Sequence, residues 1–287
     1  MARPALLALL ILAAAAAAAP IAGARELPAV LDAIDARRDE FVSQLMAYVS
    51  RPSISAQNVG VREVAELLVA QMAEMGMEAR AVPTDGHPVV VGTYGADPEK
   101  VTLLVYGHYD VQPPDPLDAW LSPPFEPTVR DGRIYARGVG DNKGQHGAAL
   151  YAVATWMDVH GALPCNLIVV LEGEEEIGSP RLLQFVTEHR DELRAADLVV
   201  TFDGPKHQTG APVVSFGVRG GIKFGAPPHA RPHARTPARS LARTLTRWLA
   251  RSPQTSSRAR PTAMRTPAAS AASCPTRCGR SSTSSGR

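Results

Sequence analysis

Apolar residues recur with two different periods along this chain, and the two kinds of segment alternate. Apolar positions that return every three to four residues predict amphipathic helices at Leu27–Val49, Val61–Met75, Gln145–His160 and Pro180–Arg190. Short runs of mostly apolar residues predict strands at Met77–Val82, Val89–Tyr94, Val101–Tyr106, Asn166–Leu171 and Leu198–Phe202. This alternation predicts an α/β fold, with a mostly parallel sheet and helices on both faces.

The pattern stops after about Gly221, and residues 223–287 are dominated by Arg, Ser, Thr, Ala and Pro. A segment so poor in large apolar side chains cannot offset the entropy lost on ordering, so we predict disorder there. All 28 acidic residues lie at or before Asp203, and so abrupt a change is typical of a reading-frame shift or a truncated gene model. The net charge of +2 averages two unlike parts and does not predict a nucleic-acid partner.

The first 24 residues have the features of an export signal. Arg3 precedes the apolar run Ala5–Ala19, and Ala22-Gly23-Ala24 has the small-x-small spacing of a cleavage site. The run is shorter than the roughly 20 residues that a membrane span needs. We therefore predict a signal peptide over residues 1–24, a periplasmic or secreted mature chain, and no membrane contact after cleavage.

Four clusters of acidic residues, one of them with a histidine, lie in order along the chain, and all but Asp141 follow predicted strands. They are His108 with Asp110, Asp141, Glu174 to Glu176, and Asp203. Side chains at the carboxyl ends of parallel strands meet outside one edge of a sheet, and histidine and carboxylates are ordinary ligands of zinc. The order of these clusters predicts a two-metal hydrolase site.

Each cluster taken alone also has an ordinary structural explanation. His108 could be a core histidine with a local carboxylate partner, and Asp141 could cap a helix. The three glutamates could form a solvated acidic loop, and Asp203 could be a turn residue. In the functional alternative, one carboxylate bridges two cations and another takes a proton from a metal-activated water.

The motifs of the chain include Tyr106-Gly107-His108-Tyr109-Asp110-Val111-Gln112-Pro113, Asp141-Asn142-Lys143-Gly144 and Glu172-Gly173-Glu174-Glu175-Glu176-Ile177-Gly178-Ser179. In these motifs the chain resembles the M20 metallopeptidases, and the resemblance runs from about Leu27 to Ile222. The first motif is closest to the dipeptidase branch, which includes carnosinases. The resemblance implies hydrolysis of the amide bond of dipeptides or small peptides. An N-acyl-amino-acid deacylase and a non-catalytic metal-binding remnant are the alternatives.

The resemblance also implies the metal ligands, for which two zinc ions are expected and manganese or cobalt are alternatives. His108 and Asp203 would bind one ion, Glu176 would bind the other, and Asp141 would bridge the two. Residues 25–222 would form the N-terminal part of the catalytic domain.

Two further roles follow from the same resemblance. Asp110 would orient the metal-binding histidine, and Glu175 would be the general base. Members of the family often have a cis peptide after the bridging aspartate, which here is the bond between Asp141 and Asn142. Many members have a second aspartate in place of that asparagine.

The region after Ile222 departs from the family. Members continue into a lid domain that usually mediates homodimerisation and carries an Asp-x-His-Ser-Gly motif. The second half of the catalytic domain follows, with a further zinc-binding histidine. Neither is found here, so the resemblance implies a chain of low activity that lacks the dimerisation domain.

Overall fold

The computed structural model of the chain describes residues 26–204 and residue 209. The predicted signal peptide (1–24) and the predicted disordered segment (223–287) lie outside these residues. Among the described helices, none combines the length and the apolar character that a membrane span requires.

Five strands form one mixed sheet in the order β1-β2-β6-β3-β7. They are β1 (Glu78–Val82), β2 (Val89–Tyr94), β3 (Thr102–His108), β6 (Asn166–Glu172) and β7 (Leu198–Thr201). β3 lies parallel to β6 and to β7, whereas β2 pairs antiparallel with β1 and with β6. The predicted α/β sheet is confirmed, but only three strands are parallel. A short turn joins β1 to β2, and such a connection allows only antiparallel pairing.

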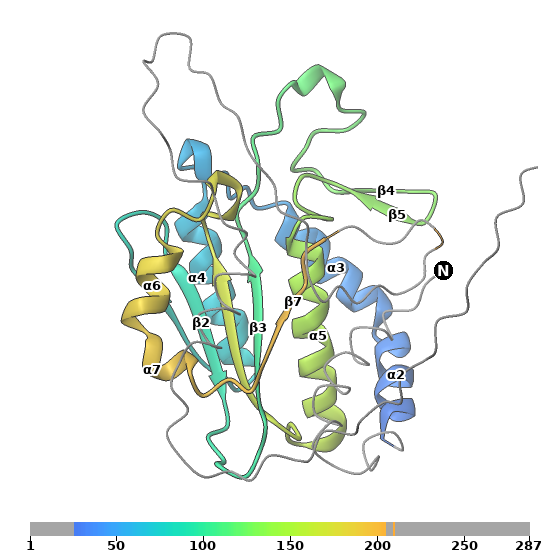
Figure 1. The fold of residues 1–287 in the computed structure, drawn as a ribbon. Helices are drawn as coiled ribbons and strands as arrows, with labels where there is room; N and C mark the ends of the chain where they lie inside the picture. Colours follow the sequence, from blue (N-terminus) through green and yellow to red (C-terminus); the bar gives the residue numbers. More distant parts are fainter. Residues whose placement is uncertain (1–25, 205–208, 210–287) are drawn as a thin grey trace, which may run out of the picture. The chain divides into compact units, whose positions relative to one another are not determined.

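Helices cover both faces of this sheet (Figure 1). One face packs against α2 (Leu27–Ala36), α3 (Arg38–Val49), α4 (Val61–Glu74) and α5 (Lys143–His160), and the other against α6 (Leu182–Glu188) and α7 (Arg190–Leu193). The single helix predicted over residues 27–49 is in fact two helices, α2 and α3, which are separated at Arg37.

The core explains why the central strands are apolar throughout. In β3, Leu103 and Val105 pack against the α2–α5 side, while Leu104 and Tyr106 pack against α6 and α7. Successive side chains of a strand point to opposite faces, so a strand covered on both faces buries every residue. All seven residues of β3 and all seven of β6 are buried.

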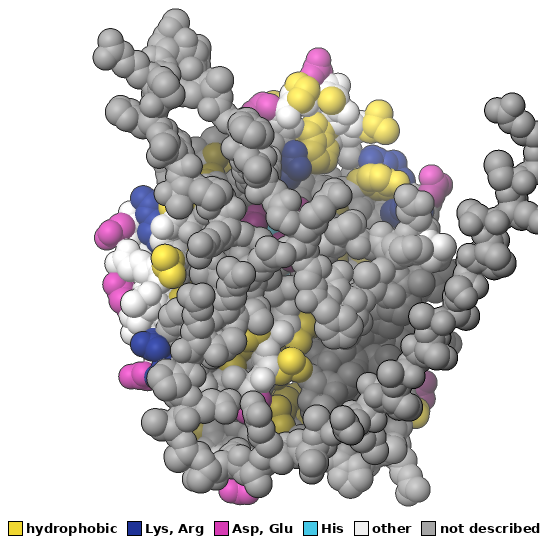
Figure 2. All heavy atoms as spheres, in the orientation of Figure 1, with side chains coloured by type: hydrophobic (Ala, Val, Ile, Leu, Met, Phe, Trp, Pro, Cys, Tyr) yellow, Lys and Arg dark blue, Asp and Glu magenta, His cyan; other side chains and the backbone are white. Residues whose placement is uncertain are grey.

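The chain leaves the sheet between β3 and α5. A short helix, η3 (Leu117–Ala119), is followed by a hairpin, formed by β4 (Thr128–Arg130) and β5 (Arg133–Tyr135). Leu121 is 91% exposed and Leu117 is 59% exposed. Apolar side chains gather on the surface over this loop in Figure 2.

Candidate metal centre

Three of the predicted ligands come together where β3 and β7 end and α5 begins. His108 is the last residue of β3, Asp203 follows β7 by two residues, and Asp141 precedes α5 by two residues. One imidazole nitrogen and one carboxylate oxygen from each aspartate all lie within 4.8 Å of one another. In the described part of the chain, no other such group of His, Cys, Asp or Glu side chains is found.

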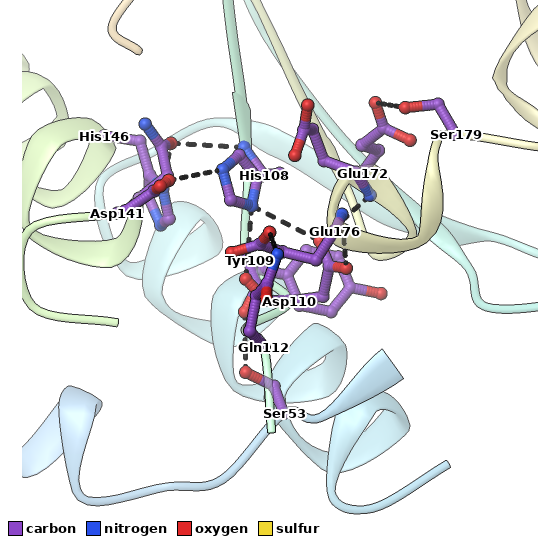
Figure 3. Close-up of polar contacts among 12 residues, drawn as sticks. Ser53, His108, Tyr109, Asp110, Gln112, Asp141, His146, Glu172, Glu176 and Ser179 are labelled. Atoms are coloured by element: carbon purple, nitrogen blue, oxygen red, sulfur yellow. Dashed lines mark hydrogen bonds and ion pairs between the residues drawn. The ribbon is translucent and has the colours of Figure 1, made fainter. Parts of the chain in front are cut away.

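The buried imidazole of His108 has a carboxylate at each of its two nitrogens (Figure 3). Nε2 lies 3.0 Å from Oδ1 of Asp141. Nδ1 lies 3.1 Å from the backbone oxygen of Asp110 and 3.3 Å from its Oδ1. Burial alone would lower the pKa of His108, but the hydrogen bonds to Asp110 and Asp141 outweigh it and raise the pKa to about 11. The imidazolium therefore supplies positive charge that a divalent cation could replace, with release of the proton.

Asp110 connects the histidine to the glutamate cluster. Its carboxylate is fully buried and accepts the backbone N–H groups of Glu175 and Glu176, each at 3.1 Å. The short helix η4 (Glu175–Ile177) is held beside His108 by these bonds. This second contact of Asp110 was not predicted, because backbone donors leave no pattern in the sequence.

Burial raises the pKa of three carboxyl groups around His108, namely those of Glu175, Glu176 and Asp203. In each case a neighbouring carboxylate raises the pKa further, while His108 lowers it. Carboxylates that repel one another in a partly buried site are stabilised by a cation placed between them. An imidazole nitrogen together with carboxylate oxygens is a donor set that suits zinc, manganese or cobalt. The residues present therefore fit a divalent metal.

Glu176 does not belong to the three-residue group. Its Oε2 accepts a hydrogen bond from Nε2 of Gln112 at 2.7 Å (Figure 3). The role of Glu176 as a ligand of a second ion stays a prediction, as does the role of Glu175 as general base. The contact with Gln112 was not predicted, although this glutamine belongs to the same motif as His108.

A further buried acid lies at the end of β6. Glu172 accepts hydrogen bonds from the hydroxyl groups of Tyr106 and Ser179. Burial raises the pKa of Glu172 to about 8, so this side chain is mostly neutral at pH 7. The sequence placed Glu172 in the acidic motif but did not distinguish it from its neighbours.

The start of α5 contains buried polar residues to which the sequence analysis assigned no role. The bond between Asp141 and Asn142 is cis, as the resemblance implied. Lys143 is fully buried, donates from Nζ to the backbone oxygen of Arg51 at 2.6 Å, and lies 4.9 Å from the ring centroid of Tyr48. Burial lowers the pKa of Lys143 to about 7. Gln145 and His146 follow Asn142 by three and four residues, and this helical spacing could have indicated that they share its face.

Known proteins with similar sequences have longer chains than this one. The family model described as peptidase family M20/M25/M40 matches residues 104–276. The Cys-Gly metallodipeptidase dug1 of Schizosaccharomyces pombe is 36% identical over 204 residues, which cover 66% of this chain and 43% of that protein. The Beta-Ala-His dipeptidase of Homo sapiens is 34% identical over 213 residues, which cover 68% of this chain and 42% of that protein. The chain thus spans less than half the length of these curated relatives.

Solved structures are similar over a comparable share of the chain. Human carnosine dipeptidase 1 superimposes with a TM-score of 0.59 at 33% identity, covering 62% of this chain and 41% of that one. The M20 family metallo-carboxypeptidase Sso-CP2 from Sulfolobus solfataricus gives a TM-score of 0.57 at 38% identity, covering 60% of this chain and 39% of that one. These structures match the α/β fold predicted from the sequence.

One prediction from the sequence is wrong on this comparison, namely that the chain is periplasmic or secreted. The similar Cys-Gly metallodipeptidases of Schizosaccharomyces pombe, Candida albicans and Saccharomyces cerevisiae are cytosolic dipeptidases. The apolar run Ala5–Ala19, on which the prediction was based, lies outside the described residues. Its composition is a weak signal, because alanine is also the strongest helix former.

Proposed function

The chain belongs to the peptidase family M20/M25/M40, and from this premise we propose that it is a divalent-metal-dependent dipeptidase. The observation that carries the proposal is the convergence of His108, Asp141 and Asp203 beside the base candidate Glu175. The names of the curated relatives specify Cys-Gly and β-Ala-His as substrates, so small dipeptides are the proposed substrate class. Residues 25–222 are the proposed N-terminal part of the catalytic domain.

We assign His108 and Asp203 to one zinc ion, Glu176 to a second, and Asp141 to both. One imidazole nitrogen with several carboxylate oxygens is a common zinc environment, and manganese or cobalt would accept the same donors. A bound divalent ion would supply Lewis-acid chemistry, polarising the scissile carbonyl and lowering the pKa of a water molecule.

Glu175 is the proposed general base. Burial raises the pKa of its carboxyl group above the ordinary value, which makes it a better proton acceptor near neutral pH. Its backbone N–H is fixed by Oδ1 of Asp110, so the same aspartate positions both the base and His108. Glu175 would take a proton from the attacking water and deliver it to the leaving amine.

The experiment is a hydrolysis assay of the purified chain after chelation and after return of zinc, manganese or cobalt. Three substrates are compared: Cys-Gly, β-Ala-His and an N-acetyl amino acid. The variant Glu175→Gln should bind metal as the wild type does but lose at least about 100-fold in kcat. The matched control is Glu99→Gln, which changes an exposed acid outside the site.

Metal-dependent cleavage of a dipeptide, lost in Glu175→Gln and kept in Glu99→Gln, would support the proposal. Cleavage of the N-acetyl amino acid alone would identify a deacylase instead. Metal binding without hydrolysis of any substrate would leave a metal-binding remnant and contradict the proposed activity.

A further inference from the structure

The three candidate ligands lie on separate segments, and the β-ladder stops before it reaches all of them. The pairing of β3 with β7 ends at Thr201, two residues before Asp203. Asp141 lies outside the strands, in the turn before α5. A further connection is needed to keep both carboxylates near His108.

The side-chain amide of Asn142 makes that connection. Its Oδ1 accepts the backbone N–H of His108 at 3.2 Å, and its Nδ2 donates to the backbone oxygen of Phe202. His108 is itself a candidate ligand, Phe202 precedes Asp203, and Asn142 follows Asp141. One fully buried side chain thus joins all three segments that carry the ligands.

The two ends of this amide cannot be exchanged. Nδ2 also donates to Oε1 of Gln145 at 2.7 Å, and Oδ1 also contacts Nδ1 of His146 at 3.1 Å. Two donor and two acceptor positions are therefore all in use, which is the full capacity of an amide. The reversed amide would direct its NH2 group at the N–H of His108 and its oxygen at the oxygen of Phe202.

Two further groups hold the amide in place. Because Nδ1 of His146 faces an acceptor, this nitrogen carries the proton, and Nε2 accepts the hydroxyl of Tyr48 at 3.0 Å. Burial lowers the pKa of His146 to about 3, so the ring stays neutral. Gly107 provides the space, because a Cβ there would lie 2.8 Å from Oδ1 of Asn142.

We propose that Asn142 is a positioning residue, whose amide sets the spacing of the metal ligands by joining the ends of β3 and β7 to the start of α5. This inference rests on the metal site of the proposed function. Groups that orient metal ligands without binding the metal typically change its affinity about 10- to 100-fold. The variant Asn142→Ala should weaken metal binding within that range.

The test is a titration of the metal-free, full-length chain with Co2+, whose visible absorption reports the geometry of its ligands. The matched control is Asn166→Ala at the opposite end of the sheet. Asn166 is also buried, and its amide bonds to Asp97, Lys100 and Thr102. Both variants should lower the unfolding temperature, but only Asn142→Ala should weaken Co2+ binding and alter the absorption.

If Asn142→Ala does not fold, a second pair of variants tests the same proposal. In Gly107→Ala the added methyl group presses on Oδ1 of Asn142, and Co2+ binding should weaken. In Gly92→Ala the methyl group meets Sδ of Met72, 2.5 Å away in the core. This second substitution should cost stability and leave the Co2+ affinity unchanged.

The outcomes separate this inference from the proposed function. If the wild type binds Co2+ and Asn142→Ala, or Gly107→Ala in its place, has the same affinity and absorption, Asn142 has no positioning role. Equal weakening in a variant and its matched control would overturn the inference too, because lost stability would then explain both. A wild type that does not bind Co2+ would overturn the proposed metal site and this inference with it.

Discussion

The two ends of the parallel strands β3, β6 and β7 bury polar groups in different ways. At the amino end, the amide of Asn166 bonds to the backbone of Asp97 and Lys100 and to the hydroxyl of Thr102. At the carboxyl end, carboxylates converge on the ring of one histidine, His108. The polar group buried at the amino end is a neutral amide, whereas several ionisable side chains lie close together at the carboxyl end.

This difference has an energetic consequence. At the carboxyl end, burial raises the pKa values of Glu172, Glu175, Glu176 and Asp203. A raised carboxyl pKa means that the ionised group destabilises the folded state at neutral pH. Groups of this kind cluster at functional sites, where stability is given up for chemistry. The amino end buries a neutral amide, and the carboxyl end holds the carboxylates that we propose as metal ligands.

The largest expected effect comes from removing one carboxylate at the charged end. Asp203→Asn should weaken binding of zinc or Co2+ by more than the roughly 10- to 100-fold typical of groups that only orient a ligand, because the variant removes a proposed direct ligand. The metal-free variant should nevertheless unfold at a higher temperature than the wild type at pH 7. The pKa of Asp203 is raised from 3.8 by burial, so its ionised form opposes folding, and the gain should vanish below about pH 4.

The control for this effect lies at the other end of the same strands. Oδ2 of Asp197 accepts the backbone N–H of Thr102 at 2.9 Å. Asp197→Asn should leave metal affinity unchanged and should not stabilise the protein. A metal-free Asp203→Asn variant that is less stable than the wild type at pH 7 would contradict the assignment of electrostatic cost to the carboxyl end.

The second effect is a pH dependence caused by Glu172. Its pKa rises from 4.5 to about 8 on folding, so the folded state binds more protons between these values. The free energy of unfolding of the metal-free protein should fall as the pH rises from 4.5 to 8, by at most about 1.4 kcal/mol per pH unit. Glu172→Gln keeps an oxygen for Tyr106 and Ser179 and should abolish this contribution. Urea denaturation at several pH values measures it, with the exposed Glu99→Gln as control.

Lys143 should produce a pH dependence of similar size and opposite sign. Burial lowers its pKa from 10.5 to about 7, so the unfolded state binds more protons between these values. The stability of the wild type should therefore rise with pH from 7 to 10.5. Lys143→Met removes the cost of burying the charged amine but also loses the hydrogen bond to Arg51. The free energy of unfolding of this variant should therefore rise relative to that of the wild type only as the pH falls towards 7. Lys100→Met, at an exposed lysine, should show no such trend.

Much of the fold at both ends could be predicted from the sequence. The apolar runs located β3 and β6 to within two residues at each end, because strands covered on both faces admit few polar residues. The position of His108, Asp141 and Asp203 after strands or before a helix predicted that they converge. The antiparallel pairing of β2 with β6 was not predicted, because strand order depends on contacts between distant segments.

The buried polar network was not predicted, for a physical reason. Sequence patterns assign polar positions to the solvent, yet Lys143 is enclosed and bonds to Arg51, far away in the sequence. The same holds for the amide of Asn142, whose partners lie at the ends of two strands. Hydrogen bonds between distant segments follow from the assembled fold, and a single sequence carries no periodic signal for them.

The smallest expected effect tests the neutral end. Thr102→Val keeps the shape of the side chain in β3 but removes the hydroxyl that accepts from Nδ2 of Asn166 at 3.3 Å. The loss should be about 0.5–1.5 kcal/mol of unfolding free energy, with no change in Co2+ affinity. Because neither partner titrates, the loss should be the same at pH 5 and pH 9, whereas the effect of Glu172→Gln changes between these values. If the loss of unfolding free energy caused by Thr102→Val varied with pH, the amino end would also hold ionisable groups with shifted pKa values. The contrast between the two ends would then be wrong.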